Sequence, residues 1–409
     1  MGSVSRAPKF MLLTYCTNIH PSNGWADVLA SIQRYAPPLK AALSPDESFG
    51  IGLRLSGQES VELLQGDHLT AFKQYLDEAG LMVYTMNGFP YGPFHGEPVK
   101  DQVHAPDWRD PERVNYTIRL AKALALLLPE GLDGGISTNP LAYKPWFQGG
   151  VDDTDWTLMT HHVVDVVAEL VRIHQQTGKL IHIDIEPEPD GVLETSAELV
   201  EYVEEWLLPV GGVLLATELG LDEDEATALL LEHVRVCWDT CHVAVMCEDP
   251  ADVLARYQAV GLKVGKIQIS SALKVYLSSD PTVRQATQTA LLSFVESTYL
   301  HQVIQQNRDG SLMAYRDLDE ALPHIFAPEA TQWRIHFHVP IFIERYGAFD
   351  STQDGIVETL RLFEQQPFTN HLEIETYTWG VLPPDLQKPL GESIRREFEW
   401  VQQTMAALR

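Results

Sequence analysis

Five short β-type runs in this sequence each carry a potential metal ligand at or near their C-terminal ends. The runs are HIDIEPEP (182–189), VCWDTCH (236–242), KIQISS (266–271), RIHFHVP (334–340) and HLEIETYTW (371–379), and the residues are Glu186, Asp239, Gln268, His338 and Glu375. In a (β/α)8 barrel, the C-terminal ends of the strands meet where the βα loops build the active site. Carboxylate, imidazole and amide donors that converge there suit a divalent ion. The pattern therefore predicts a barrel with a metal site at its mouth.

Strand-like runs alternate with helical stretches along the chain, which is typical of βαβ units and a parallel sheet. Besides the five runs above, strands are predicted within 10–20, 48–56, 81–90 and 134–140, and helices at 69–80, 113–129 and 155–178. This gives nine β-type runs, one more than a barrel needs. Either one run lies off the barrel, or the run at 334–342 belongs to an insertion before the last strand that feeds residues into the mouth. No Gly/Ser-rich linker or repeat divides the chain, so we predict one α/β domain, a (β/α)8 TIM barrel, over residues 1–409.

The charge of the chain restricts its partners. It has 29 basic and 57 acidic side chains and a net charge of −28. Such a surface repels phosphate backbones and anionic lipids, so nucleic acid is not expected as a partner, although the acidity also simply favours solubility. The N-terminal segment MGSVSRAPKFMLL has too short an apolar run for a secretion signal, and no stretch approaches the roughly 20 residues of a membrane span. A cytoplasmic protein without a membrane span is expected.

Cysteine contributes little to the predicted site. Four cysteines in 409 residues do not form a disulfide scaffold. Cys237 and Cys241 flank Asp239 in a C-x3-C pattern, but there is no second pair to complete a zinc site. We interpret both as small buried hydrophobic residues.

Two loops have an unusual composition. NGFPYGPFHGEPVKDQVHAPDW (87–108) follows the third predicted strand, and TNPLAYKPWFQGG (138–150) follows the fourth. Loops longer than about 12–15 residues are usually functional or disordered, and the first is too rich in aromatic residues for disorder. We predict that it is a lid whose Phe89, Tyr91 and Phe94 pack over the mouth of the barrel.

Several motifs of this chain resemble one known family. They are TNIHP, the loop at 87–108, GISTNPLAYK, IDIEPEP, WDTCHVAV, QISSALK, FHVPIF and EIETYTW, and they extend from about Tyr15 to Trp379. Together they resemble the EboE family of metabolite traffic proteins, which are encoded in bacterial secondary-metabolite clusters. That family is classed with the xylose isomerase-like TIM barrels, which include sugar isomerases, sugar epimerases and endonuclease IV. The resemblance implies this fold, a small-molecule substrate such as a polyol or keto-sugar, and partner proteins from the same cluster.

The superfamily pattern implies a role for individual residues. Glu186 matches its glutamate after strand five, Asp239 with His242 matches its Asp and His after strand six, and Glu375 matches its glutamate on strand eight. Its strand-seven histidine is Gln268 here, so His338 is expected to enter the site from the insertion. The resulting expectation is metal binding by Glu186, Asp239, Gln268, His338 and Glu375, and substrate binding by His20, Asn87, Phe89, His242 and Trp379. His20 is equally compatible with a polar core residue, and His182, His336 and His371 are expected to be structural.

These residues predict metal-assisted proton transfer next to a carbonyl. One divalent ion, which is Mn, Zn, Co or Mg, would chelate two oxygens of a polyol or hydroxy-ketone and stabilise the enediolate. Glu186 and Glu375 would act as acid and base. Two alternatives remain open. One is a non-catalytic carrier that keeps the metal pocket, and the other is a metal-dependent hydrolase, which would need more histidine ligands.

Overall fold

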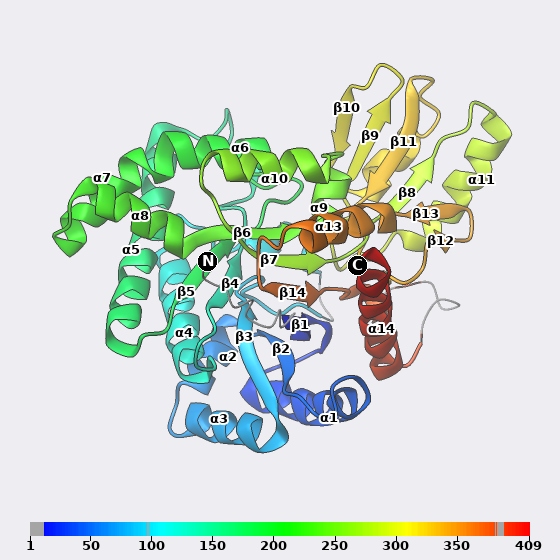
Figure 1. Ribbon diagram of the computed structural model, residues 1–409. Helices are drawn as coiled ribbons and strands as arrows, with labels where there is room; N and C mark the ends of the chain where they lie inside the picture. Colours follow the sequence, from blue (N-terminus) through cyan, green and yellow to red (C-terminus); the bar gives the residue numbers. More distant parts are fainter. Residues whose placement is uncertain (1–11, 96–97, 381, 383–387) are drawn as a thin grey trace, which may run out of the picture.

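The structure is a computed structural model, and it describes residues 12–95, 98–380, 382 and 388–409. The start of the first predicted strand and part of the loop at 87–108 lie outside these residues. Eight parallel strands form a nearly closed barrel in the order β1-β14-β7-β6-β5-β4-β3-β2 (Figure 1), and a bridge between Cys16 and Gly52 joins the two edges. The barrel strands are β1 (Leu12–Tyr15), β2 (Phe49–Arg54), β3 (Leu81–Asn87), β4 (Gly134–Thr138), β5 (Ile181–Ile185), β6 (Val234–Asp239), β7 (Val264–Ile269) and β14 (His371–Ile374). This confirms the predicted fold class.

Fourteen α-helices occur among the described residues, and all except α11 and α12, which belong to the segment between β7 and β14, pack around the barrel strands or follow them. They are α1 (Trp25–Leu43), α2 (Gly57–Leu63), α3 (His68–Ala79), α4 (Pro111–Leu127), α5 (Asp153–Thr177), α6 (Ser196–Tyr202), α7 (Pro209–Leu219), α8 (Glu223–His233), α9 (Thr240–Val245), α10 (Pro250–Ala259), α11 (Pro281–Leu291), α12 (Leu318–Ala321), α13 (Gln353–Gln365) and α14 (Leu390–Leu408). Local sequence sets their ends. The Asp152 side chain accepts two backbone N–H bonds at the start of α5, and Gly178 ends that helix in the left-handed conformation, as is common for such caps. No helix among the described residues is both long and apolar enough to cross a membrane.

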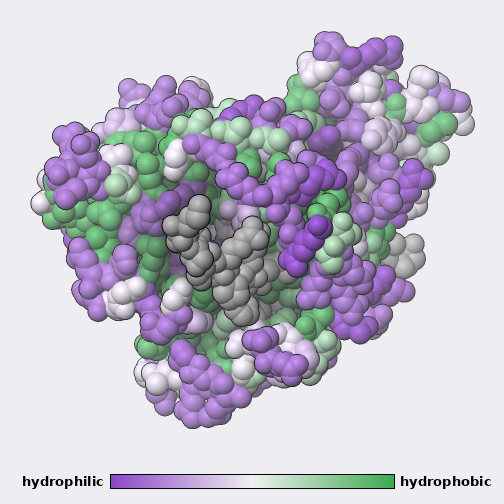
Figure 2. Space-filling model, in the orientation of Figure 1, coloured by the Kyte–Doolittle hydropathy of each residue, from purple (hydrophilic) through white to green (hydrophobic). Residues whose placement is uncertain are grey.

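The ninth β-type run lies off the barrel. Residues 273–351, which we call the insertion, contain a six-stranded antiparallel sheet in the order β10-β9-β11-β8-β13-β12. Its strands are β8 (Leu273–Tyr276), β9 (Val303–Asn307), β10 (Leu312–Tyr315), β11 (Ala330–Ile335), β12 (Arg345–Tyr346) and β13 (Phe349–Ser351). The predicted run at 334–342 begins in β11, and the segment that follows β11 returns to the barrel, where Val339 N–H donates to Ser271. In Figure 1 the sheet projects beside the barrel, and the face seen in Figure 2 is mostly hydrophilic there.

The interior of the barrel is polar rather than filled only by branched apolar residues, which usually dominate such cores. Lys266 on β7 and Glu373 on β14 form a fully buried ion pair with a Nζ–Oε1 distance of 2.7 Å. Small residues leave room for these groups, since a Cβ at Gly52 would lie 1.5 Å from the Glu373 Oε2 atom. The barrel therefore has a charged layer directly below the ends of its strands.

Candidate metal centre

Three carboxylates meet at the C-terminal end of the barrel. Asp239 ends β6, Glu186 follows β5 and Glu375 follows β14. All three are buried, and one oxygen of each lies within 4.8 Å of the others. The structure thus brings together the three carboxylates that the strand pattern predicted, because parallel strands end at one edge of the barrel.

Hydrogen bonds fix two of these carboxylates. The Glu375 Oε1 atom accepts from the side-chain amides of Asn18 at 2.7 Å and Asn87 at 3.0 Å. The Asp239 Oδ1 atom accepts from Ser270 Oγ at 2.5 Å and from two backbone N–H groups at the start of α9. In contrast, Glu186 Oε2 and Asp239 Oδ2 are buried and have no hydrogen-bond partner within the described chain. Buried polar atoms without partners are rare and require an explanation, and a bound cation would supply one.

The electrostatics of this cluster favour a positive charge. Burial raises the pKa of Glu186 well above its ordinary value, and the charge of Asp239 raises it further. Burial also raises the pKa of Glu375 well above its ordinary value, and the charge of Glu186 raises it further. Burial opposes ionisation of Asp239, but His242, His338 and Ser270 outweigh it and lower its pKa. Carboxylates that repel one another in a dry site take up protons unless a cation is present.

Histidines border the carboxylates on the side of the insertion. His242 lies on α9, and His336 and His338 follow β11. Two further sets of donor atoms lie within 4.8 Å of one another, namely Asp239 with His242 and His338, and Cys241 with His336 and His338. His338 therefore enters the site as predicted. His336, which was expected to be structural, lines the same cavity.

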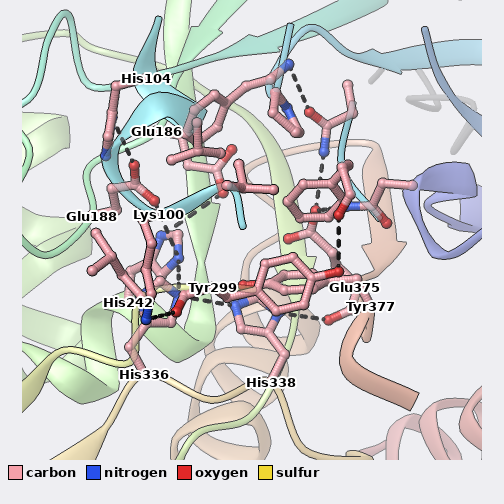
Figure 3. A pocket seen from close by; sticks show the side chains of 18 of the residues that line it. Lys100, His104, Glu186, Glu188, His242, Tyr299, His336, His338, Glu375 and Tyr377 are labelled. Carbon is pink, nitrogen blue, oxygen red and sulfur yellow. Dashed lines mark hydrogen bonds and ion pairs between the residues drawn. The ribbon is translucent and has the colours of Figure 1, made fainter. Parts of the chain in front are cut away.

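A small cavity lies between the carboxylates and the histidines (Figure 3), and it has a volume of about 60 Å³. Its lining includes Asn18, Asn87, Phe89, Phe94, Val99, Lys100, His104, Glu186, Glu188, His242, Tyr299, Gln302, His336, His338, Glu375 and Tyr377. A space of this size holds a few water molecules, so a substrate as large as a sugar requires its walls to move.

The loop at 87–108 forms much of the cavity wall. Phe89 and Phe94 line it as predicted, but Tyr91 packs on Tyr116 outside it. The described part of the loop is tied to the insertion, because Lys100 Nζ lies 2.6 Å from an Asp317 carboxylate oxygen and Val99 N–H donates to Thr298. The insertion therefore holds the loop in place over the site.

We expect Lys100→Ala to increase the rate of proteolysis within this loop about two- to fivefold, because a partly exposed ion pair contributes up to about 1 kcal/mol. Limited proteolysis with and without a bound ligand measures it, and ligand binding should protect the loop. Lys122→Ala is the matched control, since Lys122 forms an exposed ion pair with Glu169 away from the loop. Equal cleavage in both variants would show that the contact with Asp317 does not hold the loop.

Three predicted residues lie elsewhere. His20 does not line the cavity; it stacks on Tyr35 with ring centroids 4.5 Å apart, which favours the core alternative. Trp379 packs against Phe342 and is also outside the lining. Gln268 is fully buried on the same face of β7 as Lys266, and its amide atoms have no hydrogen-bond partner among the described residues, so its role as a ligand stays a prediction.

Sequence reasoning gave no definite role to two cavity residues. Glu188, two residues after Glu186, lies 3.4 Å from the His104 ring, and burial raises the pKa of Glu188 well above its ordinary value. Burial lowers the pKa of His104 to about 3. Alternation along the run after β5 indicates that Glu188 shares the face of Glu186, but no local pattern places His104, because it comes from an irregular loop.

Comparison with known proteins supports the fold. Neither protein-family models nor curated protein sequences gave a match. Among solved structures, a xylose isomerase-like TIM barrel protein from Mycobacterium smegmatis in complex with magnesium has a TM-score of 0.51 at 11% identity, with 97% of each chain covered. An L-ribulose 3-epimerase has a TM-score of 0.49 at 9% identity, with 97% of this chain and 95% of that chain covered. A D-tagatose 3-epimerase-like protein has a TM-score of 0.49 at 11% identity, with 97% and 98% covered.

The strand order and the mycobacterial structure together define the class of the fold. This chain has the fold of the xylose isomerase-like TIM barrels. Sequence identities this low do not identify the reaction that a protein catalyses, because one barrel fold supports many chemistries.

Proposed function

We propose that this protein is a divalent-metal-dependent enzyme of the isomerase or epimerase type, which moves a proton next to a carbonyl of a polyol or hydroxy-ketone. One observation carries the proposal. Glu186 and Glu375 belong with Asp239 to one group of donor atoms that lie within 4.8 Å of one another. Two carboxylates that face a single cavity can act as acid and base on the same substrate.

The residues present fit a cation. Three buried carboxylates supply its ligands, and the unpartnered Glu186 Oε2 and Asp239 Oδ2 atoms provide free lone pairs. When bound, the ion would polarise the oxygens of the substrate. Oxygen donors suit Mg, Mn, Co or Zn, and the magnesium in the mycobacterial barrel is in line with a hard ion here. Gln268 remains part of the proposal as a further ligand, whereas the predicted ligand His338 directs its Nε2 atom toward His336.

The protein's own groups define what the site does to a proton. Asn18 and Asn87 fix the Glu375 carboxylate by donating to Oε1. Burial raises the pKa values of Glu186 and Glu375 when no cation is present. A bound ion would favour their ionised forms, in which either carboxylate could accept a proton from the substrate and return it. Phe89, Phe94 and Tyr377 give the cavity an aromatic wall. These features support proton transfer in a closed site rather than hydrolysis.

The resemblance to the EboE family supports a place in a secondary-metabolite pathway, with partner proteins from the same cluster. It also keeps one alternative open, in which the protein binds and delivers a metabolite without changing it. Both functions use the same pocket, so only turnover separates them.

Proton exchange in deuterated water, with a panel of keto-sugars and polyols, tests the proposal. We expect solvent deuterium at the carbon next to the carbonyl with the wild-type protein. Glu186→Gln and Glu375→Gln should lose the ion held by the three carboxylates and should reduce exchange to the background. Glu188→Gln is the matched control for metal content, since Glu188 is equally buried in the cavity but lies outside that group.

Two results would contradict the proposal. Full metal occupancy in both Glu186→Gln and Glu375→Gln would exclude this carboxylate site. Binding of a metabolite without any exchange by the wild-type protein would favour the carrier.

A further inference from the structure

Three imidazole rings point toward one another at the side of the cavity formed by the insertion (Figure 3). The Nε2 atom of His336 lies 3.2 Å from Nε2 of His242 and 3.3 Å from Nε2 of His338. All three rings are buried and line the cavity. His242 comes from α9, whereas His336 and His338 come from the segment after β11, so a tertiary contact between barrel and insertion assembles the group.

The opposite nitrogen of each ring fixes its tautomer. His242 Nδ1 lies 3.0 Å from the Pro187 carbonyl oxygen, and His338 Nδ1 lies 3.0 Å from the Glu375 carbonyl oxygen. A carbonyl oxygen only accepts hydrogen bonds, so each Nδ1 carries the ring proton. In the neutral ring, Nε2 then has a free lone pair.

His336 is fixed in the same way through a side chain. Its Nδ1 lies 2.8 Å from Gln302 Oε1. The Gln302 Nε2 atom donates to the Pro189 carbonyl at 3.3 Å, which sets the orientation of the amide and turns its oxygen toward His336. His336 therefore also directs a bare Nε2 into the group.

Lone pairs that face each other at such distances repel unless a proton or a metal cation lies between them. Zinc binds imidazole nitrogens at about 2.0–2.1 Å, so two ligands of a tetrahedral ion lie roughly 3.3–3.4 Å apart. The two Nε2 separations from His336, 3.2 Å to His242 and 3.3 Å to His338, agree with this spacing. Donor atoms within 4.8 Å of one another join His338 to His336 in one set and to His242 in another. Histidine ligands of metals also typically donate their other N–H to an oxygen, as all three rings do here.

We propose that His242, His336 and His338 form a zinc-type metal site that is distinct from the carboxylate site. Its fourth position faces the cavity beside Glu188, whose Oε2 atom lies 3.9 Å from His242 Nε2. Three histidines with an open position are typical of catalytic rather than structural zinc sites, and an oxygen of a substrate or of water fits there. Asp239 belongs to the carboxylate group with Glu186 and Glu375, and it also forms a group of donor atoms with His242 and His338. The site stands whether or not the carboxylates hold an ion.

Metal titration of the full chain tests this site. The protein is stripped with a chelator, reloaded with Zn²⁺ or Co²⁺ alone, and measured by elemental analysis and visible absorption. We expect two ions per wild-type chain, one in His336→Ala and one in Glu186→Gln. Tetrahedral Co²⁺ absorbs far more strongly in the visible than six-coordinate Co²⁺, so the strong band should persist in Glu186→Gln and disappear in His336→Ala.

Two further variants sharpen the test. His104→Ala removes another cavity histidine that lies outside every donor group, so it should keep both ions. Gln302→Leu removes the acceptor that orients His336, and it should weaken zinc binding about 10–100-fold, as loss of such partners does in other metal sites.

The outcomes separate the two metal sites. A weak Co²⁺ band in the wild-type protein overturns the histidine site. This result does not depend on whether any variant folds. Unchanged ion content in His336→Ala also overturns it. If Glu186→Gln keeps two ions while His336→Ala loses one, the carboxylate ion of the proposed function fails and the histidine site stands.

Discussion

Lys266→Met is expected to reduce the free energy of unfolding by about 3–5 kcal/mol, because it leaves Glu373 buried without its partner. The two side chains are completely buried, and their charged atoms lie 2.7 Å apart. Burial opposes the charge of Lys266, but Glu373 outweighs burial and raises the pKa of Lys266. Apart from Lys266, Glu373 has a hydrogen bond from Thr14 at 3.2 Å, which cannot neutralise it.

A double-mutant cycle separates the pair from general damage to the barrel. Urea unfolding followed by tryptophan fluorescence compares Lys266→Met, Glu373→Gln and the double variant. The double variant should recover much of the lost stability, since it removes both charges and keeps an acceptor for Thr14. Strictly additive losses would show that the charges do not depend on each other.

Glu397→Gln is expected to stabilise the protein above neutral pH. Glu397 on α14 is buried, and it accepts hydrogen bonds from Thr376 Oγ1 at 2.7 Å and from the Ile341 N–H at 3.3 Å. Burial raises the pKa of Glu397 from 4.5 to about 8. The folded state therefore favours the neutral carboxyl, and Glu397 loses its stabilising contribution as the pH rises from about 4.5 through 8. Glutamine stays neutral, so the variant avoids this loss, which is up to about 5 kcal/mol.

Unfolding midpoints at pH 5, 7 and 9 measure the effect of Glu397→Gln. The variant and the wild-type protein should be similar near pH 5 and diverge toward pH 9. Glu399→Gln on the same helix is the matched control, because Glu399 is exposed and pairs with Arg395. Parallel pH profiles for all three proteins would mean that folding does not raise the pKa of Glu397.

The barrel was predictable because each of its strands is a short apolar run with its own flanking helix. The insertion was only partly predictable. Its strands are short and partly exposed, and β9 reads VIQQN, where glutamine and asparagine conceal the strand pattern. The sequence indicated one extra run, but it did not indicate a separate sheet. A single domain over residues 1–409 stays a prediction.

The candidate site was predictable where ligands follow barrel strands. Glu186, Asp239 and Glu375 follow from strand position alone. His336 was expected to be structural, and its place in the cavity depends on the return of the chain after β11, which the alternation of a strand does not describe. Lys266 was missed although it lies two residues before Gln268 on the same face of β7. An isolated lysine in an otherwise apolar strand is a signal that could have identified it.

The contacts of the insertion have a consequence for any attempt to reduce this protein to its barrel. The same segment supplies His336 and His338 from one side and anchors the loop through Asp317 and Thr298 from the other. A shortened chain without residues 273–351 would lose two imidazoles and the support of the cavity wall in one step. Selection acting on this segment therefore cannot adjust access to the pocket independently of the imidazoles that line it, and the insertion and the barrel mouth have to change together.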